Sequence, residues 1–312
     1  MTDPTATAPP LIVLCGPTAT GKTALSLQLA QWMEVEVISA DSRQVYLGMD
    51  VGTAKVTQQE RSLVPHHLID LIAPDESFSV SRFVEMAESV ARGIQSRNCT
   101  TLVVGGTGLY IRGLTEGLLD APSADEPLRL ELQQRESRGG PGTLHKMLTR
   151  VDPESAASIH PNNLVKIVRA LEVYAQSGRP ISALQKEHGF AQKKYPLLKL
   201  GLFLPQEQHE TLMLRRTEAM FAQGLLDETE ALLRRGYEPE TSALRTLGYH
   251  EAVAVLRGRM KVEEAISKVY VRTRQYAKRQ MTWFKKDPEI IWVDSCREFV
   301  KIRSFIGNFM QI

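Results

Sequence analysis

A glycine-rich turn near the amino terminus constrains this chain more than any other feature. The eight residues Gly16-Pro17-Thr18-Ala19-Thr20-Gly21-Lys22-Thr23 fit the pattern of a phosphate-binding loop. An apolar run at residues 11–15 precedes them, and the leucine spacing of residues 22–33 predicts a helix after them. Because a strand, the loop and a helix follow in the order that the motif requires, a chance glycine turn is the weaker interpretation.

Each part of this motif contributes to the binding of phosphate. The glycines let backbone amides converge on phosphate oxygens, and the helix N-terminus adds partial positive charge. Lys22 supplies a full positive charge, and the Thr23 hydroxyl is suited to ligate Mg²⁺. The motif leaves the substrate open, because nucleoside triphosphatases, small-molecule kinases and some transferases share it.

Alternating strand and helix patterns predict a parallel α/β sheet with its ligands at the carboxyl ends of the strands. Strands are expected at residues 11–15, 35–39, 101–104, 197–204 and 290–293, and helices at 22–33, 79–97, 208–235, 249–257, 262–285 and 296–309. The fold class is therefore a P-loop NTPase-like parallel sheet flanked by helices.

The middle of the chain has a different pattern. Residues 121–194 contain helical patterns at 125–138, 143–151, 153–159 and 162–177 and no convincing strand. We expect an all-helical domain inserted into the α/β domain, which leaves residues 1–120 and 195–312 as the core.

Two polar positions follow predicted strands at the same edge of the sheet as the phosphate loop. Asp41 follows the second strand, where a carboxylate can accept a proton from an incoming nucleophile, although a turn aspartate is an equally weighted interpretation. Thr107 lies in the run Gly105-Gly106-Thr107-Gly108 after the third strand, and a tight turn is the alternative there. Both side chains are expected to face the site.

Composition gives weaker limits. The length of 312 residues allows one large domain or two smaller ones, and no apolar run is long enough for a membrane span. The start, residues 1–10, lacks a secretory signal, so the cytoplasm is the default location. Cys15, Cys99 and Cys296 are far apart and odd in number, which favours three reduced and mostly buried thiols over disulfides or a zinc site.

The net charge of +2 conceals a basic segment at residues 257–286. Its basic residues are Arg257, Arg259, Lys261, Lys268, Arg272, Arg274, Lys278, Arg279, Lys285 and Lys286. Only Glu263 and Glu264 oppose them before Asp287, so a polyanionic partner is a candidate. On charge alone, a solvated helix face is the better interpretation.

Several further motifs, taken in order, resemble one family. Together with the phosphate loop they are residues 41–46 (DSRQVY), 49–55 (MDVGTAK), 65–70 (PHHLID), 104–110 (VGGTGLY), 169–173 (RALEV), 248–249 (GY) and 278–284 (KRQMTWF). The set is similar to bacterial tRNA dimethylallyltransferases, also called tRNA isopentenyltransferases, over residues 11–293. Any one block is weak, but the ordered set is specific.

The resemblance implies an activity with defined partners. The donor would be dimethylallyl diphosphate and the cofactor Mg²⁺. The acceptor would be the N6 amine of the adenosine just 3′ of the anticodon, in tRNAs that read codons starting with U. The products would be N6-isopentenyladenosine and diphosphate. Nothing in the sequence demands more than a monomer, and no membrane partner is implied.

The same resemblance assigns roles to residues. It implies Asp41 as general base, Thr107 near the diphosphate and the target base, and Lys22 with the loop residues 16–23 and Arg216 as diphosphate ligands. The family implies tRNA contacts at Asp41, Ser42, Arg43, Gln44, Thr107, Arg129, Val165, Lys166, Ile167, Val168, Arg169, Arg245, Gly248, Tyr249 and His250. Lys278 and Arg279 of the basic segment are added as further predicted contacts with RNA.

The chain departs from the family at one helix. Many members carry two arginines four residues apart after the returning strand, whereas here Leu212 takes the first place and Arg216 the second. A phosphate role there depends on Arg216, with Arg215 as a possible helper. Among the aromatic residues of the basic segment, Trp283 and Phe284 are predicted to pack in the core.

Three other functions remain open from the residues. A small-molecule kinase would share the loop but would need an ATP site and a lid. An adenylate prenyltransferase would have no use for the insertion at 121–194 or the basic helix. A non-catalytic RNA-binding protein would have no use for Lys22 and Asp41 together.

Overall fold

The computed structural model describes residues 8–189 and 194–311, and its largest element is a six-stranded sheet. The strands are β1 (Leu11–Cys15), β2 (Val35–Ser39), β3 (His66–His67), β4 (Thr100–Val104), β5 (Leu197–Phe203) and β6 (Ile291–Asp294). They pair in the order β3-β2-β4-β1-β5-β6, and every pair is parallel. The predicted parallel α/β fold is confirmed, and the two-residue β3 is the strand that periodicity did not reveal.

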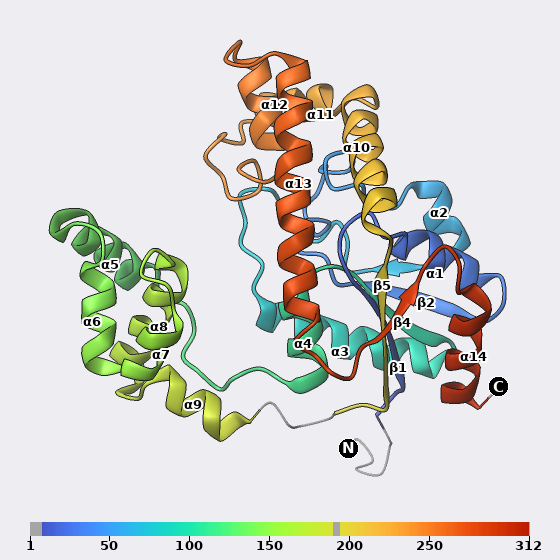
Figure 1. The fold of residues 1–312 in the computed structure, drawn as a ribbon, viewed down its shortest axis with the longest axis horizontal. Coiled ribbons are helices and arrows are strands. Elements are labelled where there is room, and N and C mark those ends of the chain that lie inside the picture. Colours follow the sequence, from blue (N-terminus) through green and yellow to red (C-terminus); the bar gives the residue numbers. More distant parts are fainter. Residues whose placement is uncertain (1–7, 190–193, 312) are drawn as a thin grey trace. The chain divides into compact units, whose positions relative to one another are not determined.

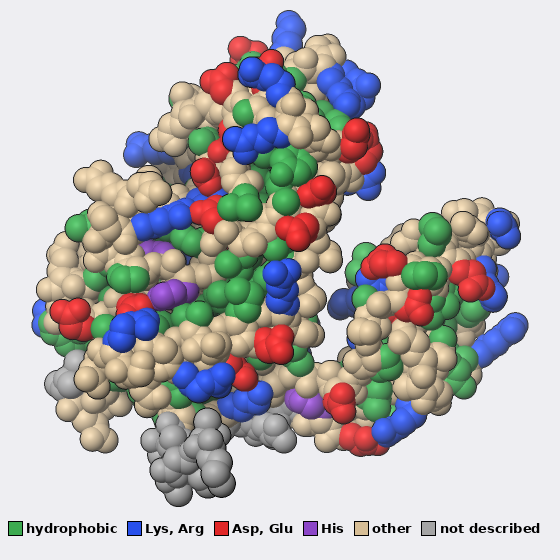
Figure 2. Space-filling view, turned by 180° about the vertical axis from the view of Figure 1, so that it is seen from behind, with side chains coloured by type: hydrophobic (Ala, Val, Ile, Leu, Met, Phe, Trp, Pro, Cys, Tyr) green, Lys and Arg blue, Asp and Glu red, His purple; other side chains and the backbone are tan. Residues whose placement is uncertain are grey.

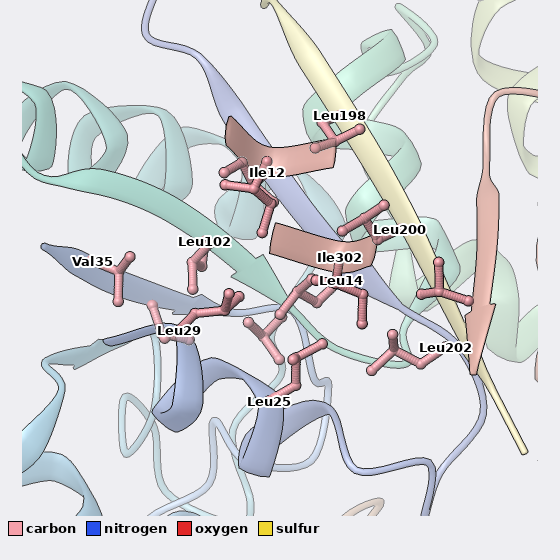
Figure 3. Close-up of a cluster of buried hydrophobic side chains, with 14 of the residues drawn as sticks. Ile12, Leu14, Leu25, Leu29, Val35, Leu102, Leu198, Leu200, Leu202 and Ile302 are labelled. Atoms are coloured by element: carbon pink, nitrogen blue, oxygen red, sulfur yellow. The ribbon is translucent and has the colours of Figure 1, made fainter. Parts of the chain in front are cut away.

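The sheet is buried because its strands are nearly continuous apolar runs. Ile12, Leu14, Leu102, Leu200 and Leu202 of β1, β4 and β5 belong to one cluster of buried side chains. Helices α1 (Lys22–Ala30) and α14 (Phe299–Met310) add their apolar faces to this cluster, as Figure 3 shows. The cluster fixes the sheet and thereby the positions of the loops at its carboxyl edge.

Seven further helices among the described residues of this part of the chain lie between successive strands in the sequence or, in the case of α4, after β4 (Figure 1). They are α2 (Gln58–Leu63), α3 (Val80–Ser96), α4 (Gly108–Glu116), α10 (Gln206–Ala222), α11 (Leu225–Arg234), α12 (Tyr249–Leu256) and α13 (Val262–Phe284). Helices α2 and α4, which are short, were not predicted from the sequence. Helix α13 packs against α10 and α12, and α3 packs against β2 and β4.

One predicted helix is wrong. The pattern over residues 208–235 is two helices, because Gly224 has a φ of 98°, in the left-handed region, and separates α10 from α11. A helix interior requires negative φ, and glycine is the residue that adopts positive φ without strain. The break lets Leu225 and Leu232 of α11 pack with Tyr249 of α12 in a second buried cluster.

The chain divides into two compact units, Met1–Thr115 with Lys194–Ile312, and Glu116–Lys193. The second unit contains α5 (Glu126–Gly139), α6 (Thr143–Val151), α7 (Pro153–Ser158), α8 (Leu164–Ser177) and α9 (Ile181–His188), and no strand among its described residues 116–189. Its own core includes Leu132, Leu144, Leu148 and Ile167. The insertion was predicted to begin at residue 121, and α9 was not predicted.

Candidate active site at the carboxyl edge of the sheet

The phosphate loop lies between β1 and α1, and its shape depends on two glycines. Gly16 and Gly21 have φ of 131° and 80°, which glycine tolerates. A Cβ on Gly16 would lie 2.5 Å from the carbonyl oxygen of Leu202 in β5, so any side chain there would clash with the sheet. The loop therefore ends at the N-terminus of α1, where unpaired amides and the helix dipole favour an anion.

Lys22 is folded back over this loop. Its Nζ donates to the carbonyl oxygens of Gly16, at 3.0 Å, and Pro17, at 2.5 Å. Burial and, to a lesser degree, repulsion by Arg216 lower the pKa of Lys22 to about 8, against an opposing attraction by Asp41. An anion beside Lys22 would offset both of the depressing effects, so this position is electrostatically prepared for one.

Arg216 on α10 supplies the second cationic group. Its pKa is lowered by burial and raised by attraction to Asp41, and its Nη2 lies 3.5 Å from the carbonyl oxygen of Thr53. Arg215 is exposed, and Leu212 replaces the other arginine of the family pattern. Arg216 is therefore the residue of this helix that is placed to act with Lys22 on a phosphate group.

Asp41 and Thr107 are held next to each other by backbone hydrogen bonds. The Thr107 amide donates to the carbonyl oxygen of Ala40 at 3.1 Å, and the Ser42 amide donates to the Thr107 hydroxyl at 3.0 Å. Oδ1 of Asp41 accepts from the Arg43 amide at 2.8 Å, so the carboxylate also closes a turn. The bond to Arg43 uses one carboxylate oxygen, and Asp41 is only partly buried. A turn aspartate and a proton acceptor are therefore compatible interpretations of this residue.

Two residues at this site escaped the sequence analysis as site residues. A ring nitrogen of His209 on α10 lies 2.8 Å from the carbonyl oxygen of Thr18. Oε1 of Gln280 on α13 accepts from the Thr18 amide at 2.9 Å, and its Nε2 donates to the carbonyl oxygen of Gly106 at 2.9 Å. Gln280 shares a buried helix face with Ala277 and Phe284, so a polar residue in an apolar stripe was the available signal. No sequence signal pointed to His209.

The loop after β2 is braced by a network of charges. The buried Lys55 donates to Asp50 and Asp70, each at 2.6 Å, and to the carbonyl oxygen of Tyr46 at 2.8 Å. Glu228 of α11 accepts from the amides of residues 50–52 at 2.8–3.2 Å and from the Tyr249 hydroxyl at 2.5 Å. These motif residues thus hold the loop that carries Asp41 and do not themselves form the phosphate site.

A divalent cation would find few protein ligands here. No group of three or more His, Cys, Asp or Glu side chains suited to a metal exists among residues 8–189 and 194–311. The Thr23 hydroxyl stands in the first turn of α1, at the end of the phosphate loop. One hydroxyl combined with phosphate oxygens and water is the ligand set that Mg²⁺ typically takes, so the residues fit this ion.

Most of the basic segment lies on α13, and tertiary partners neutralise two of its charges. Arg272 pairs with the buried Glu251, and Arg274 pairs with Glu210 at 2.8 Å. Lys278 and Arg279 are exposed on α13, and the guanidinium of Arg279 lies 5.8 Å from the centre of the Tyr276 ring, so both charges are accessible to a partner. On the face drawn in Figure 2, Lys and Arg side chains are interspersed with Asp and Glu, which agrees with the small net charge.

Two predictions about buried side chains need correction. Phe284 is buried as predicted, but Trp283 is 41 % exposed because it rests against Gly108 at the surface end of α4. Cys15 is buried, and burial raises the pKa of its thiol to about 12. Cys296 is exposed and Cys99 is half-buried, so the expectation of mostly buried thiols is wrong for these two.

The predicted tRNA contacts in the helical unit differ in exposure. Val165 and Lys166 are exposed at the start of α8, whereas Ile167 and Val168 are buried in the core of this unit. Arg129 and Arg169 both donate to Glu172, whose side chain is fully buried. The charge of Glu172 is thereby satisfied, and each arginine is held in place with about a third of its side chain exposed.

The stretch 245–250 shows the same division. Arg245 and His250 are exposed, while Tyr249 is fully buried. Gly248 has a φ of 90° at the start of α12, and its amide donates to Glu251 at 3.0 Å. Gln44 is also occupied internally, since its Oε1 accepts from the Ser39 hydroxyl at 3.0 Å. The exposed members are the ones able to contact RNA through their side chains.

Comparison with known proteins agrees with this arrangement over nearly the whole chain. Residues 44–287 match the IPP transferase family, and residues 9–66 match the isopentenyl transferase family. The tRNA dimethylallyltransferase 2 of Geotalea uraniireducens is 47 % identical over 299 residues, which cover 96 % of each chain. The tRNA dimethylallyltransferase of Symbiobacterium thermophilum is 49 % identical over 286 residues, 91 % of this chain and 89 % of that protein.

The chain belongs to the tRNA dimethylallyltransferase family. Solved structures of this family agree with its fold. The tRNA isopentenylpyrophosphate transferase of Bacillus halodurans is 38 % identical, with a TM-score of 0.70 and 97 % of each chain covered. A eukaryotic dimethylallyltransferase acting on tRNA is 28 % identical, with a TM-score of 0.80 over 97 % of this chain and 80 % of that one. The family resemblance drawn from the motifs is confirmed.

Proposed function

We propose that this family member transfers the dimethylallyl group of dimethylallyl diphosphate to the N6 amine of the adenosine 3′ of the tRNA anticodon, in tRNAs that read codons starting with U. The products are N6-isopentenyladenosine and diphosphate. One observation carries the proposal. The cations Lys22 and Arg216 and the amides of the phosphate loop adjoin a turn that presents a carboxylate, Asp41, beside the hydroxyl of Thr107.

The phosphate loop acts on a leaving group in this reaction, since no phosphoryl group is transferred. As the allylic carbon–oxygen bond breaks, negative charge grows on the departing diphosphate. Lys22, Arg216 and the amides at the N-terminus of α1 stabilise that charge from fixed positions. Mg²⁺, held partly by Thr23, supplies further neutralisation of the diphosphate when it is bound.

The acceptor side needs a base because the lone pair of the adenine amine is delocalised into the ring. Asp41 accepts an amine proton as the carbon–nitrogen bond forms, and such a base contributes about 10²–10⁴-fold to a rate. The backbone bonds from Ser42 and Thr107 hold the carboxylate in place while this happens. All of these groups come from one chain, so a monomer suffices.

The RNA is bound by groups outside this centre. The exposed side chains of Lys278 and Arg279 on α13, together with Arg245 and His250, are the proposed contacts in the α/β unit. Val165, Lys166, Arg129 and Arg169 are the proposed contacts in the helical unit. Extrusion of the target base costs a few kcal/mol, less in a loop than in a duplex, and phosphate contacts offset that cost.

A labelling experiment tests the activity. We expect label from dimethylallyl diphosphate to appear in unmodified tRNA but not in AMP, since AMP lacks the stem and loop that the helical unit would bind. ATP is expected to remain intact, because the donor already contains the leaving group. Release of ADP in proportion to product would contradict the proposal and favour a kinase. Label on AMP alone would favour an adenylate prenyltransferase.

Binding of tRNA is expected to depend strongly on salt through Lys278 and Arg279. Replacing both by alanine should make the plot of log affinity against log salt shallower by about 1.5, since each lost phosphate contact contributes about 0.7–0.9. Fluorescence anisotropy of a labelled anticodon stem-loop at several salt concentrations measures this slope. The matched control is Lys301→Ala with Arg303→Ala on α14, which should leave it unchanged. Equal slopes for both double variants would show that Lys278 and Arg279 form only a solvated helix face.

A further inference from the structure

Gln280 links two loops of the active site that are far apart in the sequence. Its side chain is 7 % exposed and lies near the end of α13. The Thr18 amide of the phosphate loop donates to Oε1, and Nε2 donates to the carbonyl oxygen of Gly106, both at 2.9 Å. An amide side chain has one acceptor and one donor end, so a single orientation satisfies both bonds.

Gln280 and Trp283 pack closely against two glycines that follow β4. A Cβ on Gly106 would lie 2.2 Å from Nε2 of Gln280. Trp283 lies three residues after Gln280 on α13, and a Cβ on Gly108 would lie 2.2 Å from its indole ring. The last turns of α13 therefore rest directly on the backbone of this loop, through Gln280 and Trp283.

From Gly106 the hydrogen bonds continue to the proposed base. Thr107, the next residue, donates its amide to the carbonyl oxygen of Ala40 at 3.1 Å and accepts the Ser42 amide at 3.0 Å. These bonds enclose Asp41. A continuous path thus runs from the amide of Thr18, beside the diphosphate position, through Gln280 and Thr107 to the turn that carries Asp41.

We propose that Gln280 is a positioning residue for prenyl transfer: its amide fixes the phosphate loop relative to the turn that carries Asp41 and Thr107. The phosphate loop binds the group that leaves the allylic carbon, and the base acts on the amine that attacks it. The distance between the loop and the base must therefore be held constant. The bond to Gln280 also fixes the direction of the Thr18 amide, one of the backbone donors of the phosphate loop. This inference rests on the proposed function of the same site.

The first test replaces Gln280 by methionine, which has similar length but forms neither hydrogen bond. We expect single-turnover transfer, with both substrates saturating, to slow about 10–100-fold, because misplacement of reacting groups by about 1 Å costs up to about 10² in rate. Equilibrium affinities for dimethylallyl diphosphate and for the anticodon stem-loop should stay within about threefold, since both polar ends of Gln280 bind backbone groups of the protein. Thermal melting identifies any variant that does not fold.

The matched control is Thr273→Val on the same helix. Thr273 is buried, and its hydroxyl donates to the carbonyl oxygen of Val269 within α13 at 2.7 Å. This change removes a buried hydrogen bond of the helix without altering the two loops, so the transfer rate should be unchanged. A methionine variant as fast as the parent, or one slowed only as much as the Thr273 variant, would overturn the role of Gln280.

A second variant, Gln280→Glu, gives a readout that a purely structural role would not produce. The neutral carboxyl can accept from Thr18 and donate to Gly106, whereas the carboxylate cannot donate. Burial raises the pKa of such a carboxyl, so the rate relative to the parent should recover as the pH is lowered. A ratio independent of pH would contradict the proposal. A parent that transfers no prenyl group to tRNA would refute the proposed function, whereas an active parent with equally active Gln280 variants refutes this inference alone.

Discussion

Asp41→Asn is expected to slow the chemical step by about 10²–10⁴-fold, the contribution typical of a general base. Asparagine is the sharpest substitution because its side-chain oxygen can still accept from the Arg43 amide, the bond that Asp41 makes in the turn. The turn is therefore retained and only the proton acceptor is lost. Single-turnover transfer to an anticodon stem-loop, with both substrates saturating, measures the step.

The affinities separate a base from a binding group. Because the proposed mechanism has Asp41 act as the new bond forms, its loss should appear in kcat while donor and tRNA affinities stay within a few-fold. Removal of a negative charge beside Lys22 and Arg216 could even tighten donor binding slightly. Asp75→Asn, at an exposed loop position, is the control and should transfer at the parent rate. A near-normal rate for Asp41→Asn would leave Asp41 as a turn residue only.

Lys22→Ala is expected to weaken binding of the donor and to slow departure of the diphosphate. In the proposed mechanism Lys22 contacts the diphosphate before and during its departure, so its loss should raise the donor KM and also lower kcat. Loss of one such fixed charge-stabilising group costs about 10²–10³ in rate. Steady-state kinetics with the donor as the varied substrate measure both constants. A change in KM alone would assign Lys22 to binding and leave charge stabilisation to Arg216 and the loop amides.

The depressed pKa of Lys22, about 8, adds a dependence on pH. In the free protein the ammonium form, which binds diphosphate, is present below this pKa and is lost as the pH rises through it. Bound diphosphate favours the charged form and raises the pKa. We therefore expect kcat/KM for the donor to fall above about pH 8, while kcat falls only at higher pH. Lys22→Arg should move the decline in kcat/KM to higher pH, because arginine stays protonated.

The chain order of strands and helices largely determined the site from sequence. In a parallel sheet the carboxyl ends of β1, β2 and β4 lie at one edge, so the phosphate loop, Asp41 and Thr107 had to meet there. The structure confirms that Thr107 and the turn of Asp41 are hydrogen-bonded neighbours. Local patterns also gave most helices, although Gly224 divides one of them.

Positions that depend on contacts between distant segments were not available from local patterns. Within one predicted RNA-binding stretch, Ile167 is buried whereas Val165 is exposed. Tyr249 is also buried, and its hydroxyl donates to Glu228. Trp283 was assigned to the core from its place in an amphipathic pattern, but it lies on Gly108, near the end of α13, and remains partly exposed. Helical periodicity indicates which face of the helix a residue occupies. It does not indicate whether another part of the chain covers that face along its whole length.

The sequence by itself determined the parallel sheet, the anion-binding loop and the residue types able to stabilise a leaving group and accept a proton. These properties follow from periodicity and from motifs whose parts are adjacent in the chain. The tertiary structure alone decided which polar groups are joined across long sequence separations: His209 and Gln280 on Thr18, and Gln280 on Gly106. Such pairings depend on how α10 and α13 pack over the loops, and side-chain packing is a property of the assembled core.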